Sequence, residues 1–304
     1  MGFEHGFGEL PAVARRRVRL ALRDAREARG LTRGQVAEAL DWSVSKITRI
    51  EKGDVTVSTT DLRALLELCG VTDGDRVRRL LADARASRRR GWWDEPGYRE
   101  HLTPALRQML QFESEASLIR HFHPTLIAGP LQTRAYAEFI MNFWSSEMPA
   151  ADRAARLEAR LRRGVEVFDQ TDPPRYLYVF DESVLWRVVG GPRVMAEQLR
   201  HLLDLTARPD IVVRVVPLAD AAITGMLGPF TIFDLGDEEN AVLYRESLFL
   251  DEILHSGAAI ERHRGYFDQM WQAALGEEAS ARLIGARLAA LMADSGMVSG
   301  ADAP

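Results

Sequence analysis

Residues 31–53 read LTRGQVAEALDWSVSKITRIEKG, and this stretch decides the fold of the first part of the chain. Thr32 and Gln35, three residues apart, form a capping box, which predicts a helix that begins there. Ser43 predicts the N-cap of a second helix, and Gly53 predicts the end of that helix. Apolar residues recur at helical spacing in both halves. The stretch therefore predicts two short helices joined by a tight turn.

The helical pattern continues on both sides of this stretch. Val18 and Leu22 lie on one face of a helix that precedes it. Two further helices are expected after it, one with its N-cap at Ser58 and one that begins at about Asp73. We expect these five short helices to form a compact all-α domain over residues 13–90.

The rest of the chain mixes both kinds of secondary structure. β-branched and aromatic runs predict strands over residues 176–180, 211–216, 230–234 and 241–245. Apolar spacing predicts helices over residues 105–121, 133–143, 152–168, 195–206, 258–275 and 280–292. We therefore expect an α+β domain over residues 100–292, with flexible segments at 1–12 and 294–304.

Charge is distributed unevenly along the 304 residues. The first 90 residues carry 19 Lys and Arg against 13 Asp and Glu, a net charge of +6, whereas the whole chain has a net charge of −5. A basic head joined to an acidic body is typical of a DNA-binding domain attached to a second domain that does not bind DNA.

Composition also indicates where the protein works. Cys69 is the single cysteine, so no internal disulfide can form. No apolar run approaches the ~20 residues that span a bilayer, and the N-terminus lacks the pattern of a secretory signal. We expect a cytoplasmic protein that has no contact with a membrane.

The second helix of the 31–53 stretch has the properties of a recognition helix. Ile47 and Ile50 are expected to hold it against the first helix, where the small Ala37 permits a close approach. The side chains expected to face away are those of Val44, Ser45, Thr48 and Arg49. A helix held in this way can enter the major groove with its first turn at the base edges.

This stretch resembles the helix-turn-helix of the Xre and phage-repressor family over about residues 16–70. The likeness rests on the Leu-Thr…Ala…Leu pattern of the first helix, on Ser43, and on Arg-Ile-Glu-x-Gly at residues 49–53. By position, the resemblance implies base contacts from Val44, Ser45 and Arg49, with Thr48 beside them. The residues expected to position the helix on the phosphates are Arg33, Ser43, Lys46 and Lys52. For Glu51 the resemblance implies a structural role within the domain.

A second resemblance covers most of residues 100–290. It rests on the segments 122–137, 181–191, 195–199 and 228–233. Together they resemble a domain of unknown function that follows an Xre-type head in actinobacterial regulators, often called antitoxin-like. The resemblance implies that this domain binds a ligand, a small partner protein encoded by a neighbouring gene, or both.

Three functions are compatible with these patterns. The first is a homodimeric transcription regulator that binds double-stranded DNA under the control of its C-terminal domain. The second is an antitoxin-type protein that neutralises a small partner protein and regulates its own operon. The third, an enzyme fused to a DNA-binding head, needs a convergent polar pocket that the sequence does not display. We expect no catalysis, no cofactor and no metal, since His121 and His123 lack a third ligand.

Overall fold

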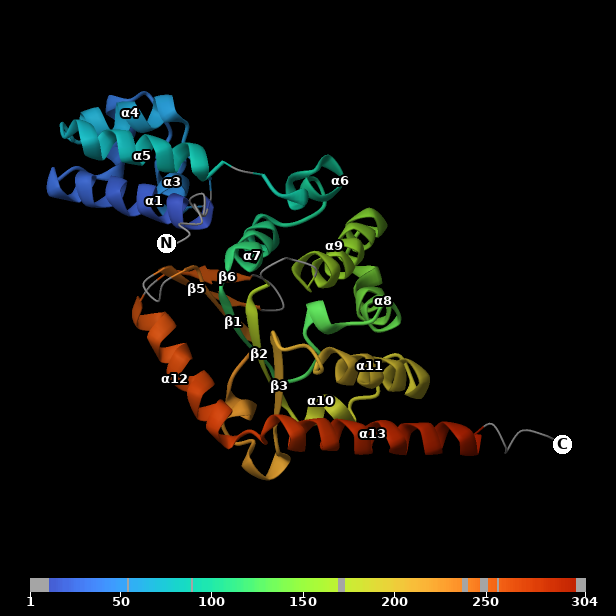
Figure 1. Ribbon diagram of the computed structural model, residues 1–304. Helices are drawn as coiled ribbons and strands as arrows, with labels where there is room; N and C mark the ends of the chain where they lie inside the picture. The colour runs from blue at the N-terminus through green and yellow to red at the C-terminus, as the bar shows by residue number, and fades with distance from the viewer. Residues whose placement is uncertain are drawn as a thin grey trace, which may run out of the picture. The chain divides into compact units, whose positions relative to one another are not determined.

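The computed structural model describes residues 11–53, 55–88, 90–168, 173–236, 240–246, 251–255 and 257–298. The chain divides into two compact units, the first ending at Gly91 and the second beginning at Trp92 (Figure 1). Within the described residues, no helix is both long enough and apolar enough to cross a membrane.

All the regular secondary structure described in the first unit is helical. Its helices are α1 Pro11–Ala28, α2 Arg33–Ala39, α3 Val44–Lys52, α4 Thr59–Leu68 and α5 Gly74–Ala86. Their apolar faces meet in one core, in which Ile47, Leu62 and Leu66 are fully buried. The five-helix prediction is confirmed.

Side-chain caps explain where these short helices begin. Thr32 and Gln35 form the predicted capping box at the start of α2. The Ser43 hydroxyl accepts a hydrogen bond from the Lys46 backbone N–H at the start of α3, and Ser58 caps α4 in the same way. These bonds satisfy backbone donors that a helix leaves unpaired at its N-terminus.

The second unit is built on a six-stranded sheet with the order β3-β2-β1-β4-β5-β6. The strands are β1 Leu118–His123, β2 Arg175–Asp181, β3 Ile211–Val216, β4 Phe230–Asp234, β5 Ala241–Arg245 and β6 Glu252–Leu254. Strands β1, β2 and β3 run parallel, and the other neighbouring pairs are antiparallel. This sheet confirms the expected α+β class.

Helices complete the second unit. They are α6 Pro96–Arg99, α7 Pro104–Glu115, α8 Arg134–Phe143, α9 Ala150–Phe168, α10 Ser183–Trp186, α11 Pro192–Leu205, α12 Gly257–Ala273 and α13 Glu277–Val298. Short 3-10 turns lie at η1 Trp92–Asp94, η2 Gly129–Leu131, η3 Trp144–Ser146, η4 Leu218–Asp220 and η5 Thr224–Met226. In Figure 1, α12 lies on one side of the sheet, and α8, α9 and α11 lie on the other.

The two faces of this sheet differ in character. Phe122 and Val179 point to the face covered by α12 and pack in an apolar core with Phe267. The opposite face carries a row of polar aromatic residues. There Phe168 of α9 packs edge-on against Tyr176, with ring centroids 5.6 Å apart.

One predicted helix is wrong in its second half. The helix expected over 105–121 ends at Glu115, and Leu118–His123 form β1, which pairs with both β2 and β4. Pairing with two strands distant in sequence overrides the local helical spacing. The short strand β6 was not expected.

The two ends of the chain contain more helix than expected. Helix α1 begins at Pro11 and α13 runs to Val298. The rest of the expected flexible segments, residues 1–10 and 299–304, lies outside the described residues.

Candidate nucleic-acid interface

A sharp turn connects α2 to α3. Asp41 adopts the left-handed conformation, with φ of 53°, which an aspartate tolerates better than most residues. The Trp42 backbone N–H then donates to the Ala37 carbonyl oxygen at 2.8 Å. Together the left-handed residue and the hydrogen bond fix the direction in which α3 leaves the turn.

One face of α3 anchors the helix in the unit. Ile47 and Ile50 are buried and belong to the same core as Val36 and Ala37 of α2. At its C-terminus, Gly53 caps α3 in the left-handed conformation. The helix is therefore held over its whole length, and its opposite face is left for an external partner.

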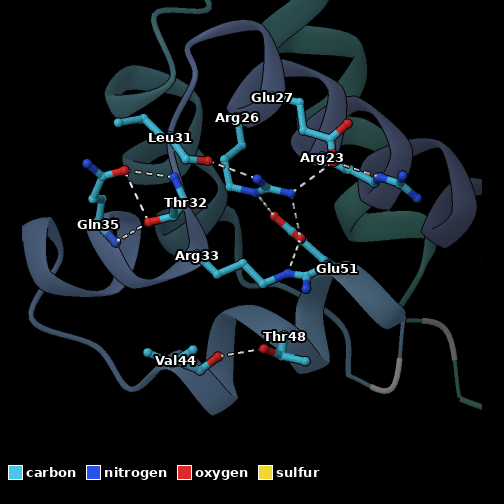
Figure 2. Close-up of polar contacts among 10 residues, drawn as sticks. All are labelled: Arg23, Arg26, Glu27, Leu31, Thr32, Arg33, Gln35, Val44, Thr48 and Glu51. Atoms are coloured by element: carbon cyan, nitrogen blue, oxygen red, sulfur yellow. Dashed lines mark hydrogen bonds and ion pairs between the residues drawn. The ribbon is translucent and has the colours of Figure 1, made fainter.

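The face of α3 that points away from the core carries the predicted base-reading residues. Val44 is 51% exposed, and Ser45 and Arg49 are exposed as well. Thr48 is partly buried, and its hydroxyl donates to the Val44 carbonyl oxygen at 2.9 Å, as Figure 2 shows. No ion pair engages Arg49 in the part of the chain that the structure describes. None of the described residues accepts a hydrogen bond from its guanidinium either.

The predicted positioning residues have different surroundings. Ser43 uses its hydroxyl to cap α3. The Lys46 ammonium lies 3.1 Å from Asp61 and 3.4 Å from the centre of the Trp42 ring, so contacts within the unit already hold it. Lys52 is exposed at the end of α3.

Arg33, the fourth of these residues, belongs to a buried cluster around Glu51. Its Nε donates to Glu51 at 2.7 Å, while Arg26 of α1 donates to both oxygens of the same carboxylate at 2.5 and 3.2 Å (Figure 2). The hydrogen bond from Arg26 to Glu51 raises the pKa of the Arg26 guanidinium. Arg33 remains 44% exposed, so its other nitrogens can still reach a phosphate.

This cluster ties three helices together. Arg26 comes from α1, Arg33 from α2 and Glu51 from α3, and a further Arg26 nitrogen donates to the Leu31 carbonyl oxygen at 2.9 Å. Glu51 therefore has the structural role that the resemblance implied. The contribution of Arg26 was not predicted, because the sequence around it is rich in arginine and nothing local distinguishes a buried one.

Comparisons with known proteins agree with this geometry. Residues 18–80 match a family model described as a helix-turn-helix domain, the class of DNA-binding protein that the α2–turn–α3 arrangement defines. Residues 106–286 match a second model, described as a domain of unknown function (DUF5753), and the chain belongs to this family. Neither curated proteins nor solved structures gave a match.

Proposed function

We propose that the protein is a sequence-specific transcription regulator of the Xre type, which reads DNA with the exposed face of α3. The observation that carries this proposal is Arg49. Its side chain is exposed on α3, and the opposite face of this helix packs into the core of a helix-turn-helix domain. An arginine in this position can donate two hydrogen bonds to a guanine in the major groove.

The other residues of α3 complete the proposed contact. Val44, Ser45 and Thr48 would meet base edges beside Arg49, while Lys52 and the exposed part of Arg33 would contact phosphates. Phosphate contacts set the register of the helix on the duplex, and base contacts supply the specificity. We assign no catalytic step to the chain.

A homodimer is part of this proposal. One recognition helix as short as α3 reads only a half-site, and helix-turn-helix proteins commonly bind two half-sites about 34 Å apart. The DUF5753 unit would then control DNA binding by responding to a ligand or to a partner in the same cytoplasm.

The alternative, an antitoxin-type protein, draws support from α8. Phe139 and Phe143 lie one helical turn apart on this helix, and both side chains are exposed. Adjacent exposed aromatic residues are typical of surfaces that bind other proteins. A small protein that copurifies with the wild-type chain, and is lost with Phe139→Ser, would favour this alternative.

Binding to DNA from the protein's own promoter region tests the main proposal. At about 150 mM salt, fluorescence anisotropy should show a preference of roughly 10³-fold or more over a scrambled duplex. A preference below about tenfold, with a folded and dimeric protein, would contradict specific recognition.

A further inference from the structure

A row of polar residues crosses the sheet face opposite α12. The register places His121 of β1 between Tyr178 of β2 and Thr231 of β4. His121 Nδ1 lies 2.8 Å from the Thr231 hydroxyl, and the His121 and Tyr178 rings are 5.5 Å apart. Tyr176 stacks on Tyr178, also at 5.5 Å. Four polar side chains from three strands therefore form one continuous cluster, which we call the tyrosine–histidine cluster.

Three polar atoms in this cluster are buried without a partner. The phenolic oxygens of Tyr176 and Tyr178 and the Nε2 of His121 make no hydrogen bond to any described residue. Both tyrosines are only 1% exposed. A buried polar group left without a hydrogen bond costs about 1–3 kcal/mol, so three such groups on adjacent side chains call for partners from outside the chain, either a bound ligand or ordered water.

Two arginines of α9 bring positive charge to the same face. Arg163 donates to both oxygens of buried Glu113 at 2.7 and 2.9 Å, and this pair is neutral overall. Arg160, one turn earlier, donates to the neutral Gln132 side chain at 3.1 Å. Among the described residues, no carboxylate lies at ion-pair distance from Arg160. The charge of Glu246 acts on Arg160 without forming an ion pair with it, so the Arg160 guanidinium keeps donors for a further acceptor.

Gly129 leaves room for these guanidinium groups. A Cβ atom at this position would lie 3.1 Å from Nη1 of Arg163 and 3.7 Å from Cγ of Arg160. The first distance is tighter than ordinary contact, so a side chain at Gly129 would push the Arg163 guanidinium aside, whereas the second is ordinary contact.

The titratable groups of the cluster are neutral at physiological pH. Burial raises the pKa of Tyr176 and Tyr178 well above the ordinary value, and the charge of Glu113 raises it further. Burial lowers the pKa of His121 well below its ordinary value and that of His123 to about 4. Both phenols thus retain their hydrogen, and they can donate to an acceptor.

We propose that the tyrosine–histidine cluster binds a small organic carboxylate. Its oxygens would accept hydrogen bonds from Tyr176, Tyr178 and His121, and its charge would balance that of Arg160. Charge-assisted hydrogen bonds of this kind are roughly twice as strong as neutral ones. The binding is a property of the second unit, whereas a signal from it to the DNA-binding unit rests on the proposed function.

Thermal unfolding and calorimetry of the full chain test this site with acetate and benzoate. Either carboxylate should raise the Tm by about 2 °C or more at saturation, and the uncharged benzamide should not. Tyr178→Phe should keep or raise the Tm of the ligand-free protein, because its buried hydroxyl has no protein partner to lose. The same variant should weaken carboxylate binding about tenfold or more.

Tyr266→Phe is the matched control, since Tyr266 lies on α12 over the other face of the sheet. It should bind the carboxylates as the wild type does. The proposal is overturned if neither carboxylate shifts the Tm, if benzamide or inorganic phosphate does so equally, or if Tyr178→Phe binds as tightly as the wild type. Ordered water alone would then satisfy the cluster. DNA affinity does not enter these readouts, so failure here leaves the DNA-binding proposal standing.

Discussion

Two lysines of α3 illustrate how a single residue's surroundings set its role. Lys52 is exposed, whereas the ammonium of Lys46 is held by Asp61 and Trp42. We expect Lys52→Ala to weaken binding to cognate and random DNA alike and to reduce the salt slope by about 1, because one phosphate contact is lost. Lys46→Ala should change the slope less. Titrations at several salt concentrations would measure both slopes, and equal slopes for the two variants would contradict this account.

Glu51 accepts hydrogen bonds from arginines of two other helices of the first unit. Glu51→Gln removes the buried carboxylate from Arg26 and leaves Glu27, at 3.2 Å, as its remaining acidic partner among the described residues. We expect this change to cost about 1.5–3 kcal/mol, the range for hydrogen bonds to charged groups. Glu38→Gln, on the exposed side of α2, should change the free energy of unfolding by less than about 0.5 kcal/mol. Urea unfolding of both variants provides the comparison. A loss below about 1 kcal/mol for Glu51→Gln would show that the cluster does not hold the three helices together.

At the scale of the element, α3 depends on its N-cap. Ser43→Ala removes the acceptor for the Lys46 backbone N–H and should lower the free energy of unfolding by about 1 kcal/mol. Ser45→Ala, two residues on, leaves every cap intact and should keep stability while it weakens specific DNA binding. Denaturation and anisotropy on the same two variants separate these effects. Equal losses of stability would argue against the cap.

Elements fixed by local chemistry were predictable, and those fixed by distant contacts were not. Helices α2 and α3 followed from Thr32, Ser43 and Gly53, because a cap involves neighbours in the sequence. The predicted helix over 105–121 included the first four residues of β1, because only pairing with β2 and β4 makes this segment a strand. The helical spacing of Ile47 and Ile50 predicted the buried face of α3, and the same spacing predicted which residues are exposed on the opposite face. The ion pair between Arg33 and Glu51 was not, because it joins residues 18 positions apart.

The tyrosine–histidine cluster was hidden for a related reason. The alternation of Tyr176 and Tyr178 in a predicted strand places both on one face, and this signal was present in the sequence. His121, which lies beside Tyr178 on the neighbouring strand β1, belongs to the segment 105–121 that was predicted to be a helix. A polar cluster across three strands becomes visible only when the register of the sheet is known.

At the scale of the whole molecule, buried histidines make stability depend on pH. His123 accepts hydrogen bonds from the backbone N–H groups of Thr125 and Leu126, and burial lowers its pKa from 6.5 to about 4. The unfolded chain therefore binds more protons than the folded one in this range. Stability should be full above pH 6.5 and fall by up to about 3 kcal/mol as the pH drops towards 4.

His123→Asn keeps an acceptor for those two backbone groups but cannot titrate. The variant should lose less stability than the wild type between pH 6.5 and pH 4.5, as measured by urea unfolding at each pH. Parallel curves for the two proteins would rule out His123 as a source of the acid sensitivity.

The central claim is that the exposed face of α3 reads bases through Arg49. Its most direct measurement is the affinity of wild type and Arg49→Ala for an operator in which each base pair is replaced in turn. The wild type should lose about 1–3 kcal/mol at one G·C pair of each half-site. Arg49→Ala should become indifferent to that pair and keep its preferences elsewhere. A variant that binds every duplex more weakly by the same factor, with an unchanged profile, would contradict the claim.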